Sequence, residues 1–273
     1  MKTNKYKILV LSDLNKNTDS ILKNTVSLSK MIDAEIDFFH VKKPIDIVER
    51  ESQLSAMRVI NKEQLGTKKK IQEFLDPFSK SYDVNINFTF AFGNIKHEIK
   101  EHIKTVKPDI IVLGKRKAKT MRFIGDNITD FVLKTHKGAI MIASSENVLE
   151  PKKEFNLGLF NGKVESFKMT FVENLIAQTQ KPLKSFNIIE SNALNEQNNT
   201  PLTEKTVDYV FDKNDNAIKN LSNYLVKNKV NLLCVNRGKS KKKSKALKSE
   251  INDIIDEVNV SLLITDSEQK QTH

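Results

Sequence analysis

Short apolar runs alternate with longer segments whose apolar residues recur at helical spacing. The strands predicted in the first half are residues 7–11, 36–41, 84–92, 110–113 and 139–142. Runs that are apolar throughout, such as residues 110–113 (IIVL), are typical of parallel strands covered on both faces. The alternation therefore predicts a βαβαβαβαβ order, that is, an α/β domain with a parallel sheet and right-handed crossovers.

The segments between these runs predict the crossover helices. An apolar stripe between Ile21 and Ile32 predicts the first helix, and Thr18 is its expected N-cap. Residues 52–80 predict a long helix, which we expect to be interrupted at Gly66 and Thr67.

The second half of the chain repeats this plan. Residues 231–237 (NLLCVNR) lie 122 positions after residues 109–115 (DIIVLGK), and residues 261–264 lie 122 positions after 139–142. We therefore predict two tandem Rossmann-like domains, residues 1–146 and 154–267, each with a five-stranded parallel sheet flanked by helices. The linker spans residues 144–154 and contains Pro151.

The best candidate site follows the strand at residues 110–113. Gly114 ends this strand and opens a basic loop, and the triplet Gly125, Asp126 and Asn127 precedes the next helix. In doubly wound sheets ligands sit beyond the carboxyl ends of the strands, where helix N-termini favour anions. This loop is the place at which we expect a phosphate-bearing ligand.

The same stretch resembles the C-terminal half of a universal stress protein domain. Nucleotide-binding members of that family carry Gly-x2-Gly-x9-Gly-(Ser/Thr) here. Gly114 matches the first glycine and Gly125 the last, but Lys117 takes the middle position and Asp126 the hydroxyl position. Seven residues rather than nine separate Lys117 from Gly125. The resemblance implies the fold of adenine nucleotide alpha hydrolases, with a damaged nucleotide motif.

In nucleotide-binding members an aspartate after the first strand and a valine ending the second strand hold the nucleoside, and here these are Asp13 and Val41. The resemblance thus implies weak binding of ATP or another adenine nucleotide in the first domain. Its candidate cofactor-binding residues are Asp13, Val41, Gly114, Lys117, Gly125, Asp126 and Asn127. Each of three residues also has an interpretation without ligand binding. Asp13 can be a turn residue, Lys117 can obstruct the pocket rather than bind phosphate, and Asp126 can be a helix cap whose charge repels phosphate.

The second domain departs further from the motif. Asn236 stands opposite Gly114, Lys239 opposite Lys117, and Asn161 replaces Asp13. We expect no nucleotide site there. In the family the last strands of paired domains commonly form the contact between them. We therefore expect the two domains to pack through their last strands as two separate sheets, and a homodimer is a further option.

Charge favours anionic partners. The chain carries 45 basic and 34 acidic residues, for a net charge of +11. Five of the eight residues 115–122 are basic, as are seven of the twelve residues 237–248. Two function classes follow: a nucleotide-binding stress-response protein, or a non-nucleotide scaffold that binds a protein or polyanion through these basic loops. Alternatively, the two basic clusters are only a solvated lysine-rich surface without a binding role.

Other functions find no support in the sequence. No catalytic motif is present, so we expect no enzymatic activity, and the five histidines and Cys234 have no metal-ligand spacing. His97 and His102 are expected at the surface. The chain lacks an apolar run of about 18 residues, so no membrane span is expected. One cysteine in an apolar run fits a reducing cytoplasm.

Overall fold

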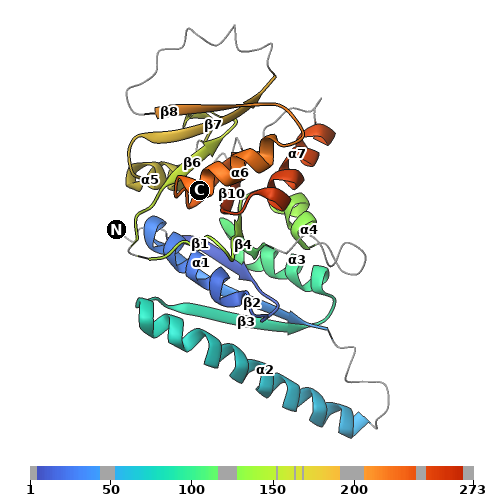
Figure 1. The fold of residues 1–273 in the computed structure, drawn as a ribbon. Coiled ribbons are helices and arrows are strands. Elements are labelled where there is room, and N and C mark those ends of the chain that lie inside the picture. Colours follow the sequence, from blue (N-terminus) through green and yellow to red (C-terminus); the bar gives the residue numbers. More distant parts are fainter. Residues whose placement is uncertain are drawn as a thin grey trace.

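The computed structural model describes residues 5–43, 53–115, 128–151, 153–162, 164–167, 169–190, 206–237 and 244–266 (Figure 1). The strands of the first half are β1 (Tyr6–Leu11), β2 (Ala34–Lys42), β3 (Ile86–Phe92), β4 (Ile110–Gly114) and β5 (Ala139–Ala143). Its helices are α1 (Thr18–Ile32), α2 (Gln53–Tyr82), α3 (Ile95–Val106) and α4 (Ile128–Thr135).

The second half uses the same alternation. Its strands are β6 (Leu157–Phe160), β7 (Leu183–Ile189), β8 (Thr206–Asp212), β9 (Leu232–Asn236) and β10 (Ser261–Thr265). Its helical elements are the 3₁₀ turn η2 (Val164–Ser166), α5 (Thr170–Gln178), α6 (Ala217–Lys227) and α7 (Ser244–Glu257). The 3₁₀ turn η2 and helix α5 together connect β6 to β7.

Within the described residues the strands form one ten-stranded sheet in the order β3-β2-β1-β4-β5-β10-β9-β6-β7-β8. All pairs within each half are parallel, which confirms the predicted α/β class. The last strands do meet, as expected. However, β5 and β10 pair antiparallel, with Met141 opposite Leu263, so the expectation of two separate sheets is wrong.

The edge pairing has a simple physical reason. Every residue of β5 and of β10 is buried, and two separate sheets would leave the backbone N–H and C=O groups of both edges without partners. Hydrogen bonding between the edges satisfies those groups. In Figure 1 the two halves accordingly lie on either side of this central pair, with α2 beside the outer strand β3.

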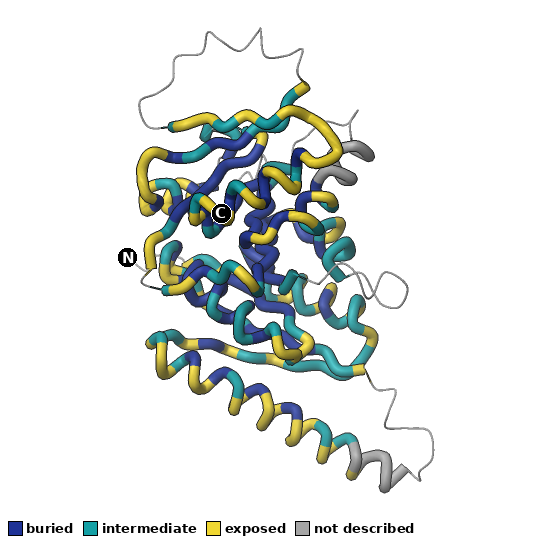
Figure 2. Tube along the Cα trace, viewed as in Figure 1, coloured by how far each residue is buried: buried dark blue, intermediate teal, exposed yellow. Residues whose placement is uncertain are grey.

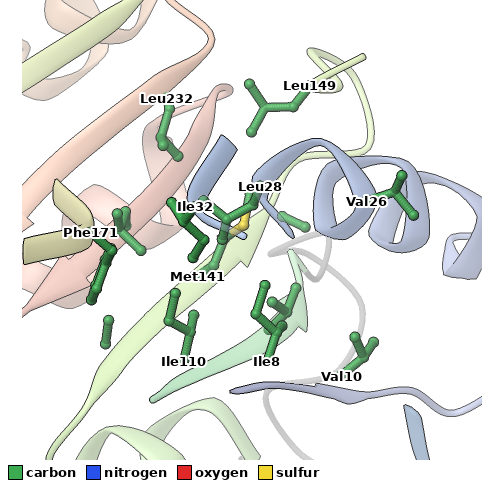
Figure 3. Close-up of a cluster of buried hydrophobic side chains, with 14 of the residues drawn as sticks. Ile8, Val10, Val26, Leu28, Ile32, Ile110, Met141, Leu149, Phe171 and Leu232 are labelled. Atoms are coloured by element: carbon green, nitrogen blue, oxygen red, sulfur yellow. The ribbon is translucent and has the colours of Figure 1, made fainter. Parts of the chain in front are cut away.

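Helices cover both faces of the sheet and bury two apolar clusters. One cluster contains Ile8, Ile110 and Met141 together with Phe171 and Leu232 of the second half, and Figure 3 shows these side chains converging. The other cluster likewise takes residues from both halves. Burial is continuous through the central strands, whereas the outward surface of α2 is exposed (Figure 2).

Two local expectations need correction. Helix α2 runs unbroken through Gly66, where an added Cβ would meet no atom within 4 Å, and it also contains Pro77. Thr18 is not the N-cap of α1: that position is Asn17, which makes no side-chain capping bond. Thr18 is fully buried, and its hydroxyl lies 2.9 Å from Ser12 Oγ. No helix in the described ranges is long and apolar enough to cross a membrane.

Candidate functional site

The strand order reverses at β1, because the chain leaves β1 toward β2 on one side and later returns to β4 on the other. A cavity of about 120 Å³ lies at the carboxyl ends of these strands. Its apolar lining includes Leu11, Phe39, Val41, Ile99, Leu113 and Ile128. Its polar lining includes Ser12, Asp13, Asn15, Asn17, Lys115 and Thr129. This is the switch point at which doubly wound sheets bind ligands.

The cavity brings together Asp13, Val41 and Gly114, three of the residues named from the sequence. The other four, Lys117, Gly125, Asp126 and Asn127, lie outside the described residues, as do residues 116–122 and 238–243 of the two basic loops.

The loop between β1 and α1 holds its shape through its own polar side chains. The Asp13 carboxylate accepts hydrogen bonds from the backbone N and the Nδ2 of Asn15, at 3.4 and 3.0 Å. Asn15 Oδ1 in turn accepts from the backbone N of Asn17 at 2.7 Å. Such Asx turns fix the backbone locally. Asp13 is exposed, so its carboxylate can still accept hydrogen bonds from a ligand.

A buried histidine ties this loop to β2. His40 lies with Nδ1 2.9 Å from the backbone oxygen of Ser12, and since a carbonyl only accepts, Nδ1 carries the proton. Burial lowers the pKa of His40, although the bond to Ser12 opposes this. The imidazole is therefore neutral near pH 7, and its bond to Ser12 holds a residue that lines the cavity.

Gly114 packs closely against α1. A Cβ on this residue would come 2.6 Å from Ile21 Cδ1 and 3.0 Å from Ile21 Cγ1, because α1 crosses closely over the end of β4. Contacts under about 3 Å between carbon atoms are strongly repulsive. The glycine that suggested a phosphate cradle in the sequence thus also makes a close packing contact, and a side chain there would have to displace the end of Ile21.

Lys115 bridges the cavity and the second half. Its Nζ donates to the backbone oxygen of Val258 at 2.6 Å and to Asn259 Oδ1 at 3.4 Å. Burial lowers the pKa of Lys115, and the carboxylates of Glu146, Asp256 and Glu257 oppose that shift. The first residue of the basic loop therefore makes a contact between the halves, a role the sequence did not indicate.

The corresponding end of the second half is occupied by protein contacts. Asn236, opposite Gly114, donates through Nδ2 to the backbone oxygen of Ser166 at 2.7 Å. Asn161, opposite Asp13, accepts through Oδ1 from the backbone N of Ile188 at 3.0 Å. At these two positions of the second half, the polar side chains therefore bond to the protein backbone.

Sequence reasoning missed several residues around the cavity. Ile95 and Ile99 of α3 line it, and their helical spacing in the sequence gives no sign of a cavity. His102, expected at the surface, instead stacks on Phe39 with ring centroids 3.9 Å apart, and its Nε2 lies 2.9 Å from Asp37 Oδ2. In the part of the chain that the structure describes, no three His, Cys, Asp or Glu side chains could hold a metal ion together.

A larger cavity, of about 840 Å³, lies under the linker between the halves. Its lining includes Asn156 and Asn231, which precede β6 and β9, so it opens at the amino ends of those strands. Its charged residues have both signs, and Lys153 already pairs with Glu150 at 2.7 Å. Because ligands of these sheets bind at the carboxyl ends, we assign the functional site to the smaller cavity.

Comparison with known proteins gives a consistent picture. A family model described as universal stress protein family matches residues 6–143. The chain matches none of the curated proteins. Among solved structures, a universal stress protein from Archaeoglobus fulgidus DSM 4304 aligns with a TM-score of 0.67 at 12% identity, covering 97% of this chain and 100% of that one. A functionally unknown protein from Pseudomonas aeruginosa PAO1 gives a TM-score of 0.59 at 8% identity, covering 96% and 93%.

Proposed function

Because this chain belongs to the universal stress protein family, we propose that its switch-point cavity binds an adenine nucleotide weakly, in the first half only. The observation that carries the proposal is the position of the cavity, at the carboxyl ends of β1 and β4 where the strand order reverses. A ligand at this place would make the chain a nucleotide-responsive stress-response protein. The degenerate second half, residues 154–267, would then act as its structural partner.

The chemistry of the lining suits a nucleoside. Apolar side chains such as Phe39, Val41 and Ile99 can cover a base, and the exposed Asp13 carboxylate can accept hydrogen bonds from ribose hydroxyls. The described cavity, about 120 Å³, is smaller than the roughly 300 Å³ at which well-enclosed ligand pockets begin. A nucleotide would therefore be only partly enclosed by the described residues, and this favours low affinity.

The site is proposed as a binding site without turnover, since no catalytic motif accompanies it in the sequence. Incubation with ATP should release no phosphate above the buffer rate. The alternative is a scaffold that binds a polyanion through the basic loops. In that case Arg237 contributes least, because its guanidinium already donates to three backbone oxygens of the other half.

Isothermal titration with ATP, ADP and cyclic AMP tests the proposal. Asp13→Ala should weaken binding about tenfold, the equivalent of one lost hydrogen bond to a charged group. Asp215→Ala, which removes an exposed aspartate of the second half, is the matched control and should leave affinity unchanged. No heat with any of these nucleotides up to about 1 mM, a Kd equivalent to about −4 kcal/mol, would contradict the proposal.

A further inference from the structure

Two basic residues at equivalent places reach across the junction of the halves. Lys115 follows β4 and Arg237 follows β9, and each donates its backbone N–H to the end of the neighbouring last strand: Lys115 to Ala143 at 2.9 Å and Arg237 to Thr265 at 2.8 Å. Their side chains then extend to the helix end of the opposite half. Cations are stabilised there, because the last carbonyls of a helix carry partial negative charge.

Arg237 makes the firmer of the two contacts. Its guanidinium donates to three backbone oxygens in the last turn of α4 and in the turn that leads to β5: Leu133 and His136 at 3.2 Å each and Gly138 at 2.6 Å. A planar guanidinium that serves three acceptors is held in one orientation. Arg237 therefore acts as a fixed connection between β9 and α4.

Lys115 makes a looser contact and also lines the switch-point cavity. It has one short bond, to the Val258 oxygen at the end of α7, and one long bond of 3.4 Å to Asn259 Oδ1. Both acceptors are neutral oxygens. An ammonium group on a flexible four-carbon chain can change acceptors more easily than a guanidinium, and a phosphate oxygen is a stronger acceptor for it than a carbonyl.

We propose that Lys115 exchanges the Val258 carbonyl for a phosphate oxygen of a nucleotide bound in the cavity, and so couples occupancy of the cavity to the end of α7. This inference rests on the proposed function, since it requires a nucleotide in that cavity. Lys115 is then the residue that distinguishes nucleotides from nucleosides. It is also the route by which the second half, without a nucleotide of its own, responds to ligand in the first.

The expected response is local. Once Lys115 leaves Val258, the last turn of α7 loses the cation that stabilises its carboxyl end. Two backbone N–H groups report on that turn. The N–H of Val258 donates to the Ile254 oxygen at 2.9 Å, and the N–H of Asn259 donates to Ser222 Oγ at 3.1 Å. Their hydrogen exchange should become faster when ligand competes for Lys115.

Hydrogen exchange of the whole chain, with saturating ATP or adenosine, tests the coupling without any substitution. ATP should speed exchange of the Val258 and Asn259 amides, whereas adenosine, which has no phosphate, should leave them unchanged. If ATP binds and these amides exchange at their unliganded rate, the inference is overturned. If neither compound binds, the proposed function fails and the inference falls with it.

Substitution gives a second readout. Lys115→Gln should weaken ATP binding about tenfold, the size of one charge-assisted hydrogen bond, while adenosine affinity stays within about twofold. Lys134→Gln, which neutralises an exposed lysine of α4, should change neither affinity. Lys115→Arg keeps the charge and should retain the preference for ATP, which provides a testable variant should Lys115→Gln fold poorly. Equal affinity of Lys115→Gln and wild type for ATP overturns the inference.

Discussion

At the scale of single residues, His136 is the clearest source of pH dependence. Its side chain is 6% exposed, and burial together with the nearby Arg237 charge lowers its pKa to about 4. In the unfolded chain the pKa is about 6.5, so between these values the unfolded state binds a proton that the folded state does not. Stability is therefore fully present above about pH 6.5 and decreases as the pH falls toward 4.

Protonation of His136 on unfolding predicts how much stability the protein loses in acid. Between pH 7 and pH 4 the free energy of unfolding should fall by up to about 3 kcal/mol through His136 alone, with His40 adding a contribution of the same sign. Urea unfolding at pH 7.0, 5.5 and 4.5 measures it. His136→Asn should flatten the profile, and His97→Gln, at an exposed position, should not. If the free energy of unfolding of His136→Asn depends on pH as it does in the wild type, groups other than His136 cause the dependence.

The contact between Gly114 and Ile21 can be tested by stability measurements alone, without a ligand. Because its added Cβ would come 2.6 Å from Ile21 Cδ1, the end of Ile21 must turn aside, and Gly114→Ala should destabilise the protein by about 1 kcal/mol. Ile21→Val removes Cδ1 and should by itself cost about 1 kcal/mol. The double variant should lose less stability than the sum of the losses of the two single variants. A double-mutant cycle measured by urea unfolding detects this difference. Strict additivity would argue against the contact.

The residue scale also shows how far sequence reasoning reached. Asp13, Val41 and Gly114 could be named from their places after strands and from the family motif, and the cavity contains all three. Lys115 stood out only as a charge. Its acceptor lies 143 residues away, and no local pattern encodes a hydrogen bond to a backbone carbonyl in another half of the fold. Distant polar contacts of this kind require the tertiary structure.

At the scale of elements, a buried asparagine joins α1 to the linker and to β10. Asn24 donates through Nδ2 to the Ser144 oxygen at 3.0 Å, and its Oδ1 accepts from the backbone N of Leu149 at 2.9 Å and from Ser261 Oγ at 2.8 Å. Both Asn24 and Ser261 are fully buried. A buried polar network of this kind is stable only when every member has its partner.

Breaking this network should be costly. Asn24→Ala leaves a buried carbonyl, a buried N–H and a buried hydroxyl without these bonds, and should lower the free energy of unfolding by about 3 kcal/mol. Lys30→Ala, at an exposed position of the same helix, should stay within about 0.5 kcal/mol of wild type. Chemical denaturation of both variants measures the difference, and similar values for the two would show that the network contributes little.

Elements were predictable where side-chain patterns specify them. The apolar runs located the strands, including β9 and β10 of the diverged half, because strands buried on both faces need apolar residues throughout. The joining of β5 to β10 was missed, since edge pairing is made by backbone groups that every sequence provides. The continuity of α2 through Gly66 was missed because propensity is a weak prior beside tertiary packing.

At the scale of the whole molecule, the halves share both their sheet and their core. The antiparallel pair β5–β10 crosses the junction, and each of the two apolar clusters contains buried side chains from both halves. Unfolding one half would expose the central edge strand of the other and the apolar surface of α1 that packs on α5. The assignment of residues 154–267 as a separate domain of the family stays a prediction from the sequence.

This architecture predicts one cooperative unfolding transition. The chain has no tryptophan, so a tryptophan placed at Phe88 on β3 reports on the first half, and one at Phe211 on β8 reports on the second. Both positions are half-buried, at opposite ends of the sheet, so each should tolerate the larger ring. Fluorescence of Phe88→Trp and Phe211→Trp and circular dichroism of each should give the same urea midpoint. Two separated midpoints would instead mean that one half remains folded alone, and that the pairing of β5 with β10 is too weak to couple them.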